Sequence, residues 1–170
     1  MNRNHFIRTG LLAGSTLMLT PSHGLHLLAE QQDDPQLDKT LVQTFVGAGH
    51  RDLNKVKEML EEYPNLLNSA HDWKYGDFET CLGAASHVGF KEMAQFLVDK
   101  GAQANIFTAT LFGKLDILKL YLTAFPTALH AKGPHGYTLL HHANQGGDEA
   151  LEVKEYLVAL GAKETRIPLY

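Results

Sequence analysis

The sequence predicts an all-α fold, a solenoid of about four helix–turn–helix repeats. The first reason is that a glycine turn followed by Thr-x-Leu-x-x-Ala occurs twice, in residues 76–85 and 134–143. The second is that each copy continues through an inter-helix glycine and an amphipathic run to a closing Gly-Ala pair. The third is that similar helical patterns lie before and between the two copies. Since three or more such units bury a continuous core, four make a stable array.

Residues 1–29 are expected to be an export signal outside the fold. Arg3 and Arg8 precede a short apolar stretch, residues 10–19, and small residues follow it, an order typical of a secretory signal. Residues 3–7 also resemble the twin-arginine export motif, with Asn4 in the place of its second arginine. We therefore expect a periplasmic or secreted protein, or a cytoplasmic one if the signal is not functional. Residues 30–36 are polar around Pro35 and are predicted to be a linker.

The composition places residues 37–170 in one folded domain. Of the 170 residues, 44% are hydrophobic and 20% are charged, which suits a packed core. The net charge of −4 argues against a nucleic-acid partner. Since no apolar run reaches 18 residues, we expect no membrane insertion after signal removal. Cys81 is the one cysteine, which excludes a disulfide framework and a thiolate-rich zinc site.

The four repeats follow one another from about residue 37. The first pairs an inner helix at residues 41–49 with an outer one at residues 53–60, and Pro64 ends it. Between the two clear copies, Gly89 to Gly113 is 24 residues and Gly113 to Gly147 is 34, which together make the 58 from Thr80 to Thr138. The third repeat is therefore about nine residues short. We expect it to keep both helices and to lack a β-hairpin finger, so that the array has two such fingers, one before the second repeat and one before the fourth.

These repeats resemble the ankyrin repeat, which has about 33 residues and begins with Thr-Pro-Leu-His-x-Ala. The fourth copy keeps Thr138, Leu140 and His141 and has Leu139 in the proline position. The resemblance implies two antiparallel helices per repeat, β-hairpin fingers and a role in protein binding. It also implies that His141 hydrogen-bonds backbone between neighbouring fingers.

The sequence contains no recognisable catalytic or metal motif. Four histidines fall within thirteen residues, but no H-x-x-x-H pair or H-E-x-x-H motif occurs. His141 and His142 point about 100° apart on a helix and cannot easily share one ion. There is no G-x-S-x-G elbow and no phosphate-binding loop. We therefore expect no enzyme activity, no catalytic residue, no metal site and no cofactor.

The remaining candidates lie on the fingers and the concave floor. Aromatic side chains on a loop that no core requires are typical of binding hot spots, although they can also fold down as packing. The predicted partner-binding residues are Trp73, Tyr75, Phe78, His87, Phe112, His135 and Tyr137.

The predicted function is a monomeric, non-catalytic module that binds a partner protein through these residues. The alternative is a small-molecule or metal-binding receptor. It would use the notch left by the missing finger and the histidines near the fourth repeat, which are His130, His135, His141 and His142.

Overall fold

The computed structural model describes residues 36–170, which form one compact unit, Gln36–Tyr170. The unit is mostly helical and contains one small antiparallel sheet, as the sequence predicts in its coarse form. The helices are α1 (Lys39–Ala48), α2 (Leu53–Glu62), α3 (Cys81–Val88), α4 (Lys91–Asp99), α5 (Ile106–Leu111), α6 (Leu115–Ala124), α7 (Leu139–Gly146) and α8 (Leu151–Ala159). The strands are β1 (Ala70–Asp72) and β2 (Phe78–Thr80).

The predicted signal at residues 1–29 and most of the predicted linker lie outside the described residues. Among residues 36–170, no helix has the length and apolar character needed to cross a membrane.

Polar side chains begin the helices where the repeat pattern places them. The hydroxyl of Thr80 accepts a hydrogen bond from the Gly83 amide at 3.0 Å and caps α3. Thr138 caps α7 in the same way, and Asn105 caps α5. Such caps satisfy amides that have no partner inside the helix. After α3, Gly89 adopts a φ of 75°, which lets the chain reverse into α4 at low cost.

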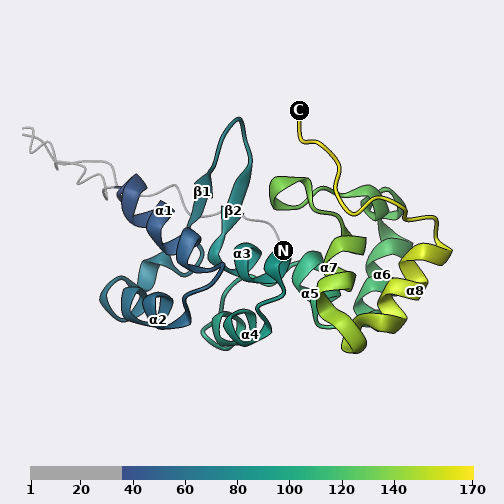
Figure 1. Ribbon diagram of the computed structural model, residues 1–170, viewed down its shortest axis with the longest axis horizontal. Coiled ribbons are helices and arrows are strands. Elements are labelled where there is room, and N and C mark those ends of the chain that lie inside the picture. The colour runs from purple at the N-terminus through teal and green to yellow at the C-terminus, as the bar shows by residue number, and fades with distance from the viewer. Residues whose placement is uncertain (1–35) are drawn as a thin grey trace, which may run out of the picture. The chain divides into compact units, whose positions relative to one another are not determined.

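The helices form four consecutive pairs, α1/α2, α3/α4, α5/α6 and α7/α8 (Figure 1). The first members lie side by side in the order α1, α3, α5, α7, so each pair contacts the next. This arrangement places the starts of successive pairs along one side of the unit, where the loops between pairs lie.

Burial confirms the expected packing of the third pair. Leu111 and Leu118 are fully buried, and Leu122 is 4% exposed. Leu111 belongs to a core cluster with α1, α3 and α4, whereas Leu118 and Leu122 belong to a second cluster with α7 and α8. Residues 100–105 alone join α4 to α5 and contain no strand, as the 24-residue spacing predicts.

Only one of the two expected fingers is a β-hairpin. Strands β1 and β2 pair in antiparallel register, with His71 opposite Glu79, and project from the row of helices (Figure 1). The loop before α7 instead forms a 3₁₀ turn, Pro134–Gly136, and the expectation of a second hairpin is wrong. Pro134 has no amide hydrogen for a strand ladder, and His135 adopts a φ of 58°, which turns the chain sharply. The loop pairs with the C-terminal segment through a bridge between Tyr137 and Arg166.

Replacing Leu118 with Ala tests the packing of the third pair. Leu118 is fully buried between α6 and the fourth pair, so its truncation removes apolar contacts and leaves a cavity. We expect the free energy of unfolding to fall by about 2–4 kcal/mol in a denaturant titration. Leu120→Ala on the same helix, where the side chain is 75% exposed, serves as the matched control. A loss below about 0.5 kcal/mol for Leu118→Ala would contradict the packing.

His142 predicts a pH dependence of stability. Its ring is fully buried, its Nδ1 donates to the carbonyl oxygen of Thr138 at 2.8 Å, and its Nε2 has no hydrogen-bond partner among residues 36–170. Burial lowers the pKa of His142 to about 4. The unfolded chain, with an ordinary histidine pKa of about 6.5, therefore binds this proton first as pH falls.

The contribution of neutral His142 to the free energy of unfolding is therefore complete above about pH 6.5. It falls by about 3 kcal/mol in all as the pH falls to about 4. We expect the difference in unfolding free energy between the wild type and His142→Asn to shrink by that amount across this window. Denaturant titrations at several pH values measure it. A difference that stays constant from pH 7 to pH 4 would show that His142 does not stay neutral in the fold.

Candidate metal centre

Four side chains from four separate elements converge at the base of the hairpin. They are His50, Glu79, His87 and His135, and one ligand atom from each lies within 4.8 Å of every other. His50 follows Gly49 in the turn between α1 and α2, and Glu79 lies in β2, one residue before the helix cap Thr80. His87 is in the last turn of α3, and His135 is at the centre of the 3₁₀ turn before α7. We call these four residues the His–Glu cluster.

The distances within the His–Glu cluster are close to the edges of a metal coordination shell. The Nε2 atoms of His50 and His87 are 3.1 Å apart. Glu79 Oε1 lies 2.9 Å from His87 Nε2, and Glu79 Oε2 lies 3.5 Å from the Nε2 atoms of both His50 and His135. In a tetrahedral zinc site with bonds of about 2.0–2.2 Å, neighbouring ligand atoms are about 3.3–3.6 Å apart. The two distances of 3.5 Å fall in this range and those of 2.9 and 3.1 Å are slightly shorter, so the cluster comes close to the spacing that an ion of this size requires.

Glu79 is a fully buried carboxylate. Burial alone would raise the pKa of Glu79, but the hydrogen bond and charge of His87 and the hydrogen bond from Trp73 outweigh burial, so the pKa lies below its ordinary value. The indole Nε1 of Trp73 donates to Oε2 at 2.8 Å and fixes the carboxylate plane. Oε1 lies 2.9 Å from His87 Nε2, the contact that lowers the pKa, but the alignment falls short of good hydrogen-bond geometry. A buried carboxylate oxygen with a poorly aligned donor is costly, and a metal ion would use it.

Two of the histidines are oriented by hydrogen bonds on their other ring nitrogen. Nδ1 of His50 lies 3.1 Å from the carbonyl oxygen of Gly47, which can only accept a hydrogen bond. Nδ1 of His135 lies 2.7 Å from Asp77 Oδ2. With the proton on Nδ1, a neutral ring presents the lone pair of Nε2 to the cluster. Carboxylate and carbonyl partners of this kind are the usual outer support of metal-binding histidines.

Asp77 holds His135 in an unusual backbone conformation. Its two carboxylate oxygens accept hydrogen bonds from the amide and from Nδ1 of His135, at 2.8 and 2.7 Å. Burial acts to raise the pKa of Asp77, but the hydrogen bonds from His135, with the nearby charge of Arg166, outweigh it, and the pKa is below its ordinary value. His135 has a φ of 58°, a region costly for residues other than glycine. Backbone strain of this kind is found mainly at functional sites, where it sets the direction of a side chain.

The ligand atoms of the cluster determine which kind of metal ion it would bind. Three imidazole nitrogens and one carboxylate oxygen suit Zn²⁺ and its first-row neighbours, whereas Ca²⁺ and Mg²⁺ prefer oxygen ligands. Cys81 does not contribute, because it lies in the apolar core and burial raises the pKa of its thiol to about 12.

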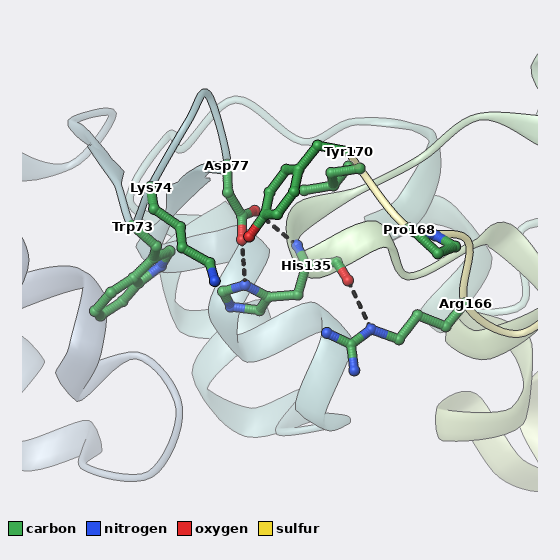
Figure 2. A pocket seen from close by; sticks show the side chains of 8 residues that line it. Trp73, Lys74, Asp77, His135, Arg166, Pro168 and Tyr170 are labelled. Atoms are coloured by element: carbon green, nitrogen blue, oxygen red, sulfur yellow. Dashed lines mark hydrogen bonds and ion pairs between the residues drawn. The ribbon is translucent and has the colours of Figure 1, made fainter.

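A cavity of about 620 Å³ adjoins the cluster (Figure 2). Its walls come from the hairpin, the 3₁₀ turn and the C-terminal segment. They are formed by Trp73, Lys74, Asp77, His135, Arg166, Pro168, Leu169 and Tyr170. His135 thus belongs to both the cavity wall and the cluster, and Trp73 in the wall donates to Glu79 of the cluster.

The predicted partner-binding residues separate into two groups. Trp73, His87 and His135 take part in the cluster, and Tyr137 stacks on His87 with ring centroids 5.0 Å apart. The others lie away from it: Tyr75 and Phe78 are 88% and 63% exposed on the hairpin, and Phe112 packs partly buried against the core. They do not form one continuous set.

Of the four histidines that the alternative function uses, only His135 joins the cluster. His130 is exposed, and Nε2 of His141 lies 2.8 Å from the carbonyl oxygen of His87. His141 therefore bonds helix backbone rather than a finger, which corrects the expectation from the resemblance.

Sequence reasoning missed His50 and Glu79. A local search for ligand pairs finds neither, because His50 is 29 residues before Glu79 and 37 before His87. One signal was available: Asp77 and His135 are 58 residues apart, the same separation as Thr80 and Thr138. They hold equivalent positions in two repeats, and equivalent positions of stacked repeats lie near one another.

In comparisons with known proteins, no family model matches this chain, and no curated protein matches it.

Proposed function

We propose that the protein binds a divalent transition metal ion, Zn²⁺ or one of similar ligand preference, through the His–Glu cluster. The observation that carries the proposal is the convergence of three imidazoles and a buried carboxylate, whose ligand atoms all lie within 4.8 Å of one another, with four contacts of 2.9–3.5 Å. This is the metal-binding form of the alternative function, with its ligands drawn from the first, second and fourth helix pairs.

Hydrogen bonding without an ion accounts less well for the geometry. The hydrogen bonds of His50 and His135 use Nδ1. The Nε2 of His50 can accept from the Nε2 of His87 at 3.1 Å, but the Nε2 lone pair of His135 faces Glu79, which is also an acceptor. Adding a proton to each ring would satisfy these contacts but would place several positive charges within 4.8 Å of one another. A single divalent ion satisfies all four ligand atoms without those extra protons.

The role that the geometry favours is binding rather than catalysis. Four protein ligands complete a tetrahedral shell, which is typical of zinc sites that join chain segments. Here the ion would join the α1–α2 turn, the hairpin, α3 and the turn before α7. We propose that it fixes the hairpin against the loop of the fourth pair.

We also propose that the scaffold is an array of ankyrin-type repeats. Support comes from the threonine caps at Thr80 and Thr138, from the positive φ of Gly89 between paired helices, and from the order of the pairs. The single hairpin and the 3₁₀ turn in the place of a second finger are departures from the pattern.

Metal content tests the proposed function. Protein prepared without a histidine tag, stripped of metal and then incubated with Zn²⁺ is passed through a desalting column and measured by plasma mass spectrometry. We expect about one zinc ion per chain. His87→Gln should retain none, whereas His130→Gln, which changes an exposed histidine outside the cluster, should retain the full amount. Wild-type protein without zinc, or His87→Gln with as much as wild type, would contradict the proposal.

A second candidate function is partner binding by the hairpin tip. Tyr75 and Phe78 expose large aromatic surfaces in the part of the chain that the structure describes. We propose that they contact a partner protein, while Trp73 serves the cluster. Tyr75→Ser with Phe78→Ser should keep zinc binding and lose capture of any host protein that wild type retains. Equal capture by the double variant would contradict this role.

Residues 1–29 are proposed to direct export to the periplasm or beyond. The support is the order of basic, apolar and small residues in that segment. N-terminal sequencing of the protein from its own host should find a start between about residues 25 and 30. An intact Met1 in the cytosol would contradict it.

A further inference from the structure

The wall of the cavity beside the His–Glu cluster carries two cations, Lys74 and Arg166, and a single carboxylate, Asp77, so its charge is net positive. Lys74 from the hairpin and Arg166 from the C-terminal segment extend toward the cavity from opposite sides, with His135 between them (Figure 2). Neither forms an ion pair with an acidic side chain of residues 36–170. The one carboxylate in the wall, Asp77, already accepts two hydrogen bonds from His135.

Other contacts hold the two cations in place. The Arg166 Nε donates to the carbonyl oxygen of His135 at 2.9 Å, and its guanidinium carbon lies 5.3 Å from the centroid of the Tyr137 ring. The Lys74 ammonium lies 5.4 Å from the centroid of the Tyr170 ring. Aromatic and carbonyl partners position a cation and leave its charge available to a ligand. An oxyanion between the two would receive charge-assisted hydrogen bonds from both.

The rest of the wall is apolar or aromatic. Trp73, Pro168, Leu169 and Tyr170 line it, and its volume of about 620 Å³ is within the range of small-molecule sites. A ligand that suits these walls combines an anionic group with an apolar or aromatic body.

We propose that this cavity binds a small organic oxyanion, a carboxylate or a phosphate ester, between Lys74 and Arg166. Its anionic group lies against His135, and its apolar body lies against Trp73 and Tyr170. The cavity and the metal centre are coupled, because His135 belongs to both, Trp73 in the wall donates to Glu79, and a divalent ion adds positive charge nearby. This coupling rests on the proposed function, whereas anion binding itself rests on the cavity.

Trp73 provides the readout, because it is the single tryptophan of the chain. Full-length protein, stripped of metal on a chelating resin, is titrated with benzoate, with phenyl phosphate and with neutral benzamide while Trp73 emission is followed. We expect saturable changes with one or both anions and at least about tenfold weaker binding of benzamide. The tighter of the two anions identifies carboxylate or phosphate as the preferred group. No saturable change with either anion, or equal binding of benzamide, would overturn the proposal.

Paired variants separate this site from the metal site. Lys74→Ala with Arg166→Ala should weaken anion binding at least about tenfold and leave zinc content at wild-type level. Lys57→Ala with Lys100→Ala, which removes two lysines from the wall of a different cavity, should change neither. His87→Gln should lose zinc and keep the anion affinity of metal-free wild type. Anion binding that survives loss of Lys74 and Arg166 would overturn the cavity proposal, whereas wild type that binds anion but no zinc would overturn only the metal proposal.

Discussion

Zinc affinity is expected to fall by at least about 100-fold when Glu79 is replaced by Gln. The substitution keeps the shape of the side chain and an oxygen that accepts the hydrogen bond from Trp73, but it removes the negative charge at the ion. Loss of an outer partner of a metal ligand typically costs 10–100-fold in affinity, and Glu79 is in direct contact with the proposed ion. Competition with a chromophoric chelator measures the dissociation constant of wild type and variant.

The matched control is Glu149→Gln. Glu149 is an exposed glutamate that pairs with Lys91 and lies outside the cluster, so the same chemical change there should leave zinc affinity within about twofold. Circular dichroism of the metal-free proteins shows whether Glu79→Gln is folded. A folded Glu79→Gln protein that binds zinc within about threefold of wild type would exclude Glu79 as a ligand.

Zinc is expected to raise the free energy of unfolding by about 4 kcal/mol when its free concentration is 1,000 times the dissociation constant. The reason is that the four ligands come from the α1–α2 turn, β2, α3 and the 3₁₀ turn, and unfolding separates them. An ion that binds the folded chain alone stabilises it by mass action. Denaturant titrations with zinc and with excess chelator measure the difference.

His87→Gln and His130→Gln form the control pair for this stabilisation. Both remove one histidine, but only His87 belongs to the cluster. The zinc-dependent gain should disappear in His87→Gln and persist in His130→Gln. A similar gain in both variants would mean that zinc acts at other side chains.

The sequence was sufficient to predict the helix pairs because the repeat pattern specifies local structure. Thr80 and Thr138 cap the helices that follow them, and Gly89 makes the turn that joins a pair, so their spacing locates the elements directly. The short connection before the third pair follows from the same arithmetic. Each of these features depends on residues that are neighbours in the chain.

The second finger could not be predicted from the repeat pattern because its geometry depends on a distant partner. A positive φ at His135 is held by two hydrogen bonds to Asp77, which lies 58 residues earlier. The pattern alone favoured a hairpin there, since it treats the two fingers as copies. The contact with Asp77 and the pairing of Tyr137 with Arg166 replace strand pairing within the loop.

The His–Glu cluster could not be predicted from the sequence for a different reason. Sequence motifs detect metal ligands that lie on the same helix or the same turn. Each of these four side chains lies on a different element. His87 and Glu79 are eight residues apart and meet only because β2 leads straight into α3. Trp73 was predicted to bind a partner, but its indole donates to Glu79 within the hairpin itself, a contact that depends on the pairing of the two strands.

A crystal structure of the zinc-loaded protein, with anomalous diffraction measured on both sides of the zinc absorption edge, tests the central claim most directly. We predict one anomalous peak among the cluster side chains, about 2.0–2.2 Å from the Nε2 atoms of His50, His87 and His135 and from a carboxylate oxygen of Glu79. A peak at other histidines such as His130, or no peak with His87 hydrogen-bonded directly to Glu79, would contradict the account.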